Sequence, residues 1–158
     1  MNTPDTAALS PADRFAADFA AGYNELPASR RFTAEQLEVI YAMGYSHVQQ
    51  QQWRQALPIF AFLSQYGPTR MHYLAGLALC LHMARRHEEA IDICSLMLVL
   101  FPESLQASMR IAECQLALGD RAGAAHTLRQ LDAALPAGDA LKGRAQALLE
   151  RVRESAPT

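Results

Sequence analysis

The sequence predicts an all-α fold made of three copies of one helix pair, and residues that recur every 34 positions carry this prediction. Prolines stand at Pro68, Pro102 and Pro136. Alanines recur at the same interval, each 12 residues before a proline, and a second set of small residues recurs 12 residues before the alanines. These small residues are Ala56, Ala90 and Ala124, and then Gly44, Ala78 and Ala112.

The residue types in this repeat have a direct structural meaning. Two antiparallel helices cross closely only where side chains are short, so Gly44 and Ala56 allow the two helices of the first repeat to touch. Proline lacks the N–H that a helix interior needs and restricts the residue before it, so it marks the turn into the next repeat. A 34-residue period with this order is the tetratricopeptide pattern. We therefore expect three tetratricopeptide repeats in a right-handed superhelical array.

Composition limits the number of domains and the kinds of partner. A chain of 158 residues, of which 51% are hydrophobic, forms one domain with a substantial core. The 16 acidic and 14 basic residues interleave without a long basic run, so neither nucleic acid nor an anionic membrane is the expected partner. No apolar run approaches the roughly 20 residues of a membrane span, and the N-terminus has no signal-peptide pattern. We expect a cytoplasmic protein that does not insert into membranes.

Residues 1–32 are predicted to form a mobile tail and an N-terminal helix. The first ten residues have little to bury. Ser10 and Pro11 then provide an N-cap and a first-turn proline for a helix from about Pro11 to Ala21. Phe15 and Phe19 lie on one face of this helix. They are expected to cover either the first repeat or a second copy of the chain.

Residues 33–137 contain the repeats, at about 37–70, 71–104 and 105–138. Thr33 and Gln36 form a capping box at the start of the first repeat. Pro58 falls about one turn inside a helix and predicts a bend or a delayed start there. The predicted helices are about Thr33–Gln50, Trp53–Gln65, Thr69–Met83, His87–Leu100, Glu103–Leu118 and Arg121–Ala134.

A last helix of about Ala140–Arg153 is predicted within residues 139–158. Leu141, Leu148 and Val152 form its apolar side, and its other faces are charged. Terminal repeats leave an open apolar face, so this helix is expected to cap the third repeat.

The sequence has no catalytic or metal-binding motif. Its five histidines include no H-E-x-x-H pair, its cysteines have no zinc-site spacing, and glycine-rich phosphate loops and nucleophile elbows are absent. Cys80 and His82, only two residues apart, lie on different sides of a helix. Cys80, Cys94 and Cys114 are expected to be reduced core thiols. We therefore expect a protein without cofactor, metal or enzymatic activity.

Binding of another protein is the function that such an array favours. The first helix of each repeat lines the concave side, where an extended or helical segment can lie. In the 34-residue frame the side chains facing this groove are Glu38, Tyr41, Tyr45, Val48 and Gln49, then His72, Ala75, Leu79, His82 and Met83, and finally Gln106, Met109, Glu113, Leu116 and Ala117. They are mostly aromatic and aliphatic, and exposed apolar area of this kind marks a partner site. Alternatively, Tyr41 and Tyr45 pack against the N-terminal helix.

The stretch from Phe32 to Leu135 resembles the tetratricopeptide chaperones of bacterial type III secretion systems, the low-calcium-response chaperone family that holds pore-forming translocators. The resemblance rests on LEVIYAMGY at 37–45, WRQA at 53–56 and YLAGL at 73–77. It rests above all on AECQL at 112–116, which is followed by Gly119-Asp120.

This resemblance implies a function and a set of contact residues. Family members bind two hydrophobic translocators in the bacterial cytosol, with an extended client segment in the groove. Carried over by position, the client-binding residues are Tyr41, Tyr45, Val48, Trp53 at the edge, His72, Ala75, Leu79, His82, Met83, Met109 and Glu113. Relatives often dimerise through the N-terminal helix, which implicates Phe15 and Phe19. Val48 and Pro58 depart from the family pattern.

Two other functions remain open from the sequence. A co-chaperone for the needle subunit of the same apparatus also uses such repeats, but clasps an amphipathic helix. A generic scaffold for charged tails would carry a clamp of Lys and Arg, and the predicted groove positions contain neither residue.

Overall fold

The structure, a computed structural model, describes residues 10, 13–14, 17–19, 21–22 and 30–154. Residues 13–14, 17–19 and 21–22 are helical. Within residues 30–154 the helices are α2 (Ala34–Gln49), α3 (Trp53–Tyr66), α4 (Met71–Met83), α5 (His87–Leu100), α6 (Leu105–Ala117), α7 (Arg121–Ala134) and α8 (Ala140–Glu154). None of these helices is long and apolar enough to cross a membrane. The all-α prediction is confirmed for the described part of the chain, which contains no strand.

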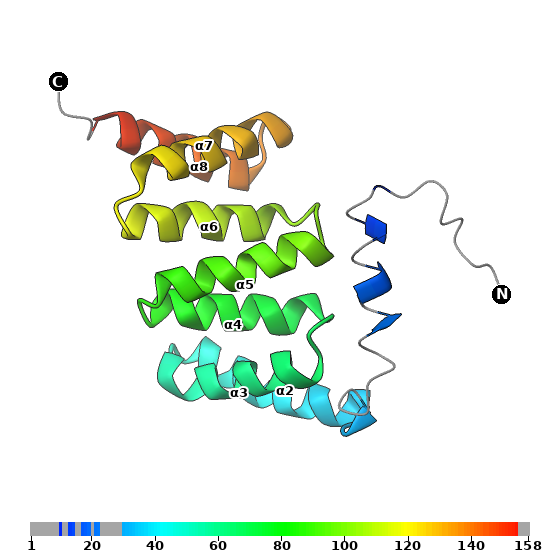
Figure 1. Cartoon of the computed structure of the whole chain (residues 1–158). Coiled ribbons are helices and arrows are strands. Elements are labelled where there is room, and N and C mark those ends of the chain that lie inside the picture. Colours follow the sequence, from blue (N-terminus) through cyan, green and yellow to red (C-terminus); the bar gives the residue numbers. More distant parts are fainter. Residues whose placement is uncertain (1–9, 11–12, 15–16, 20, 23–29, 155–158) are drawn as a thin grey trace.

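The helices stack in chain order as a layered array (Figure 1). Each helix packs against the next along the chain, and α4 also touches both α2 and α6. The first helices of the three repeats are thus neighbours on one side of the array. These contacts are the ones that a tetratricopeptide array predicts.

The recurring small residues are buried where the paired helices cross. Ala56, Ala90, Ala112 and Ala124 are inaccessible to solvent, and Gly44 and Ala78 are also buried. A Cβ atom on Gly44 would lie only 2.9 Å from Cγ2 of Ile59. The close helix crossing predicted for the first repeat is confirmed by this clearance.

Helix ends follow the capping signals of the sequence. Thr33 and Gln36 form the reciprocal capping box at the start of α2, with N···O distances of 2.9 and 3.2 Å. Asp120 accepts a hydrogen bond from the backbone N–H of Gly123 at 2.9 Å and caps α7. Gly119 has a φ of +82°, a left-handed conformation that glycine adopts without strain. The predicted caps at these two helix starts are confirmed.

Helix α3 begins at Trp53, which confirms the predicted start. It contains Pro58, so of the two effects predicted for this proline the delayed start does not occur and the bend stays a prediction. Pro58 is solvent-exposed, which allows water to satisfy the carbonyl left without a partner. Helices α4 and α6 begin two residues later than expected, because the residues just after Pro68 and Pro102 form turns.

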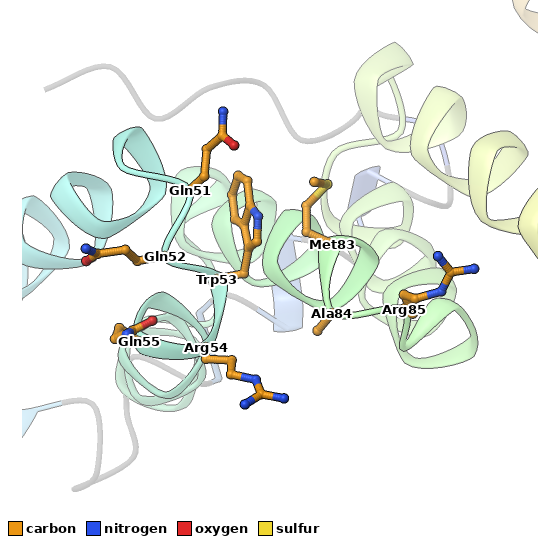
Figure 2. A pocket seen from close by; sticks show the side chains of 8 residues that line it. All are labelled: Gln51, Gln52, Trp53, Arg54, Gln55, Met83, Ala84 and Arg85. Atoms are coloured by element: carbon orange, nitrogen blue, oxygen red, sulfur yellow. The ribbon is translucent and has the colours of Figure 1, made fainter.

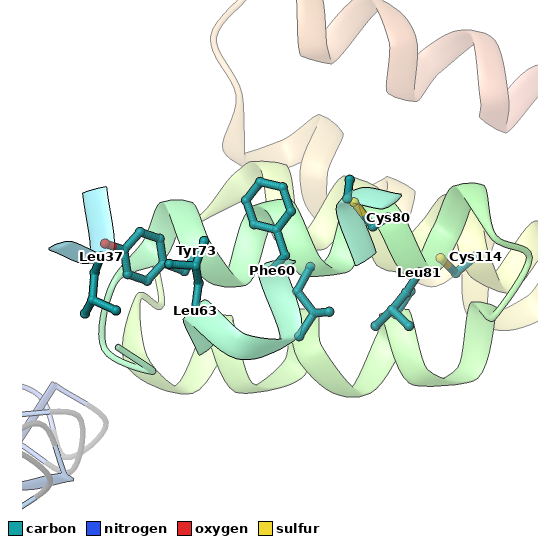
Figure 3. Close-up of a cluster of buried hydrophobic side chains, with 10 residues drawn as sticks. Leu37, Phe60, Leu63, Tyr73, Cys80, Leu81 and Cys114 are labelled. Carbon is teal, nitrogen blue, oxygen red and sulfur yellow. The ribbon is translucent and has the colours of Figure 1, made fainter. Parts of the chain in front are cut away.

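The core consists of three clusters of buried residues along the array. In the first cluster, Phe60, Leu63 and Tyr73 pack at the centre of the first two repeats (Figure 3). Helix α8 places Ala145 and Leu149 against the buried residues of α6 and α7, as expected of a capping helix. Cys80, Cys94 and Cys114 are free and buried, which confirms the predicted core thiols. Phe15 lies outside the described residues, and Phe19 is 39% exposed.

Candidate functional site

The first helices of the repeats, α2, α4 and α6, present the residues predicted to line a groove. We call this surface the A-helix face and define it by the fifteen groove positions given above. Tyr45 and Met83 are among its most accessible large side chains, at 49% and 43% exposure. Ala75, Gln106 and Ala117 are also exposed, whereas Val48, Leu79 and Leu116 are half-buried.

An aromatic cluster joins α2 to α4 on this face. The ring of Tyr41 stacks on Tyr45 at a centroid distance of 6.0 Å and meets His72 edge to face at 4.8 Å. Phe60 and Tyr73 lie 5.9 and 5.8 Å from Tyr41 on its inner side. Burial raises the pKa of the Tyr41 hydroxyl. Core side chains therefore bury much of the Tyr41 ring, whereas the Tyr45 ring stays accessible to a partner.

Glu38 of α2 connects this aromatic cluster to α4 through hydrogen bonds and ion pairs. One carboxylate oxygen accepts a hydrogen bond from the Tyr73 hydroxyl at 2.7 Å and lies 3.0 Å from Nε2 of His72 and 3.1 Å from Nη1 of Arg70. The hydrogen bond from Tyr73 is the main cause of a lowered pKa at Glu38. Burial, aided by Glu38, raises the pKa of Tyr73 to about 12. This network fixes the position of His72 relative to α2.

A second accessible patch lies where the turns inside the first two repeats meet. Trp53 at the start of α3 and Met83 at the end of α4 line a shallow cavity of about 470 Å³. Figure 2 shows the indole of Trp53 and the thioether of Met83 side by side, with Arg54 and Arg85 pointing away from them. Glutamines 51, 52 and 55 complete the lining. Trp53 thus lines a cavity together with Met83 of the A-helix face.

The third repeat differs most from the prediction. Met109, expected on the groove surface, is only 2% exposed and packs in the cluster formed with α7 and α8. Glu113 has a side chain that is 10% exposed and forms ion pairs with Arg110, at 3.3 Å, and with Arg144 of α8. The carboxylate predicted to face the groove is therefore neutralised by two guanidinium groups.

Sequence reasoning missed the contribution of α8 to this end of the face. A cavity of about 590 Å³ is lined by His82, Met83, Glu113 and Leu116 together with the α8 residues Arg144, Ala147, Leu148 and Arg151, and by Arg110. The predicted groove positions contain no Arg, but the folded surface has three here. The 34-residue frame ends before α8, so it could not reveal which residues of a capping helix turn toward the groove.

The arrangement favours binding over catalysis. Its accessible groups include aromatic rings, a thioether, short aliphatic side chains and the amides of Gln49 and Gln106, which together offer apolar area with polar groups beside it. Its charged groups pair with each other at Glu38 and Glu113. Such a surface binds a segment of another protein by removing apolar area from water.

Comparison with known protein families identifies the class of protein to which this chain belongs. Two models of the tetratricopeptide repeat match residues 41–104 and 106–135. The chain is a tetratricopeptide repeat protein. No curated protein sequence matches it.

Solved structures narrow this class to a family. PcrH from Pseudomonas aeruginosa is 33% identical, and the match covers 81% of this chain and 99% of PcrH with a TM-score of 0.70. PcrH in complex with the chaperone binding region of PopD gives 32% identity, coverage of 78% and 96%, and a TM-score of 0.71. The Yersinia enterocolitica chaperone SycD, in complex with a peptide of the translocator YopD, shares the fold at 20% identity, with coverage of 78% and 97% and a TM-score of 0.72. The chain belongs to the type III secretion translocator chaperones, the family of PcrH and SycD.

Proposed function

We propose that the protein is a non-catalytic chaperone that binds hydrophobic translocator proteins of a type III secretion system. It holds a client segment on the A-helix face in the bacterial cytosol before secretion. There it prevents premature association, aggregation and membrane insertion of the client. The observation that carries the proposal is the match to PcrH, whose complexes contain the chaperone binding regions of PopD and PopB.

The proposed contact residues fall into three groups along the face. Tyr41, Tyr45 and His72 form the aromatic centre. Trp53 and Met83 form the edge patch, and His82 and Glu113 border the cavity next to α8. Val48, Ala75 and Leu79 supply smaller surfaces between them. Met109 contributes through the core beneath the face, because its side chain is buried.

Burial supplies the binding free energy in this proposal. Apolar area removed from water contributes about 25 cal/mol per Å². Tyr45 and Met83 have their backbones fixed in α2 and α4, so the freedom lost when a client covers them is that of the side chains and not of the backbone. A few apolar client side chains can therefore be retained without nucleotide hydrolysis.

Calorimetric titration of the purified chain with the chaperone-binding region of its translocator tests the proposal. We expect Tyr45→Ala combined with Met83→Ala to weaken binding at least about tenfold, which corresponds to about 1.4 kcal/mol. The matched control is Val39→Ala, which removes a 65% exposed side chain from α2 outside the A-helix face. Binding at wild-type affinity by the double variant, with helical content retained, would disprove the groove assignment.

A pull-down from the native bacterium tests the client class. We expect one or two proteins with long apolar segments. A needle-sized partner would instead indicate a needle-subunit co-chaperone, and soluble hydrophilic partners alone would indicate a generic scaffold.

Self-association through residues 1–32 is a separate part of the proposal. It rests on the family resemblance and on the partial exposure of Phe19. Light scattering should show a smaller mass for the Phe15→Ala, Phe19→Ala variant than for the wild type. Equal masses at the same concentration would contradict a dimer through this segment.

A further inference from the structure

Three side chains of metal-ligand type meet where α4, α5 and α6 come together. His82 lies in the last turn of α4, His87 is the first residue of α5, and Cys114 belongs to α6. One ligand atom from each lies within 4.8 Å of the other two. The left-handed turn at Arg85, with a φ of +63°, brings the two histidines back toward each other.

The contacts inside this group leave binding capacity unused. Nδ1 of His82 lies 3.1 Å from Sγ of Cys114, and the two imidazole centroids are 5.1 Å apart. Nδ1 of His87 is buried and has no hydrogen-bond partner. A buried polar atom without a partner costs free energy, so native proteins rarely leave one. A cation that His87 ligates through Nδ1 would satisfy this atom.

We propose that His82, His87 and Cys114 form a site for a thiophilic transition-metal ion, with Zn²⁺ as the expected occupant. Two imidazoles and one thiolate are ligands that zinc accepts, with Zn–N distances of about 2.0–2.1 Å and a Zn–S distance of about 2.3 Å. Those lengths place tetrahedral ligand atoms roughly 3.3–3.6 Å apart. The pair of His82 and Cys114 is already close to this spacing, and a ligand atom of His87 lies within 4.8 Å of both.

The fourth coordination position points to solvent rather than to a further protein ligand. Within the described residues, the ligand group contains only these three side chains. His82 also lines the open cavity beside α8, which gives water access to the ion. The expected site is therefore three protein ligands and one water molecule.

Metal binding at Cys114 exchanges a proton for the ion. Zinc binding would break the S–H bond of the Cys114 thiol, form the Zn–S bond and release the proton to solvent. Arg110 and Arg144 oppose a cation here, but both are paired with the carboxylate of Glu113.

Cobalt titration of the full chain under reducing conditions tests the site. Bound Co²⁺ should give the near-ultraviolet sulfur-to-cobalt charge-transfer band and the visible absorption of a tetrahedral ion, and Zn²⁺ should displace it. Cys114→Ala should lose the charge-transfer band. The matched control is Cys80→Ala, which removes a second fully buried thiol that lies outside the ligand group. Absence of the band in the wild type, or its survival in Cys114→Ala, would overturn the proposal.

A second pair of variants keeps the test decisive if Cys114→Ala does not fold. His87→Gln should raise the dissociation constant for Co²⁺ at least about tenfold, since even outer-shell changes cost 10- to 100-fold. His126→Gln, which changes an exposed histidine of α7, should leave it unchanged. Equal cobalt affinity in wild type and His87→Gln would overturn the site. Neither variant touches Tyr45, so the outcome is independent of the client-binding assay.

Discussion

Replacing Gly76 by alanine should destabilise the array, although alanine is the better helix former. A Cβ atom at this position of α4 would lie 2.1 Å from Cε1 and 2.3 Å from Cδ1 of Phe60. The ring cannot move away easily, because Phe60 is 2% exposed and its other edge faces Gly44, where a Cβ atom would lie 3.1 Å away. The Phe60 ring therefore fills the space between α2 and α4 that the missing side chains of Gly44 and Gly76 leave open.

The magnitude follows from two opposing terms. Alanine in place of glycine stabilises a helix interior by about 1 kcal/mol. Overpacking a filled core costs about 1–3 kcal/mol, or more where the neighbour cannot move. A contact of 2.1 Å to a fully enclosed ring puts Gly76→Ala at the upper end of that range. We expect a net loss of about 1–2 kcal/mol in the free energy of unfolding.

Urea unfolding followed by far-ultraviolet circular dichroism measures this effect. The matched control is Gly143→Ala in α8, where nothing lies within 4 Å of the added methyl group. This control should gain about 0.5–1 kcal/mol, so the same substitution should have opposite signs at the two sites. A Gly76→Ala protein as stable as the wild type would refute the conclusion that the Phe60 ring leaves no room for a methyl group at position 76. Adding Phe60→Leu to Gly76→Ala should recover stability relative to the sum of the single changes, because the two side chains share one space.

Two further predictions concern ionisable groups. Hydrogen bonding, chiefly from Tyr73, lowers the pKa of Glu38 below its ordinary value of 4.5, so its contribution to stability is present above that value and lost as pH falls through the folded pKa. The urea midpoint of unfolding should therefore decrease when the pH is lowered from neutral to well below 4.5, and it should decrease less in Glu38→Gln than in the wild type. An equal decrease of the midpoint in the two proteins would contradict this prediction. Burial raises the pKa of Cys80 and Cys114 to about 11 and that of Cys94 to about 12, so all three thiols should react with Ellman's reagent only on unfolding. Fast labelling of any of them in the native protein would contradict this burial.

Much of the fold could be predicted from the sequence because the repeat fixes it locally. Small residues at helix crossings and prolines at repeat turns gave the frame, and the helices His87–Leu100 and Arg121–Ala134 begin and end at the predicted residues. The aromatic centre of the A-helix face was predicted for the same reason. Tyr41 and His72 come from neighbouring repeats, and the frame alone places them on adjacent helices.

The terminal repeat could not be predicted in the same way. Position 5 of the repeat is half-buried at Tyr41 and exposed at Ala75, but the equivalent Met109 is buried. In this last repeat, α8 occupies the place that a fourth repeat would take, and its apolar side covers α6 and α7. The sequence of α8 shows that it is amphipathic, but its rotation about its own axis depends on packing.

The ligand group of His82, His87 and Cys114 was missed for a related reason. Sequence spacing was tested within one helix, where Cys80 and His82 lie on different sides, whereas the structure joins His82 to a cysteine 32 residues later. The repeat frame could have indicated this proximity. His82 is near the end of the first helix of the second repeat, and Cys114 lies on the first helix of the third repeat. Residues one repeat apart on stacked helices are neighbours, so ligand searches in repeat proteins should compare positions across repeats as well as along the chain. The same reasoning links the site to the A-helix face. His82 lines the cavity beside α8, and its Nδ1 lies 3.1 Å from Sγ of Cys114, so a metal ion bound there would fix the position of one residue of the proposed client surface.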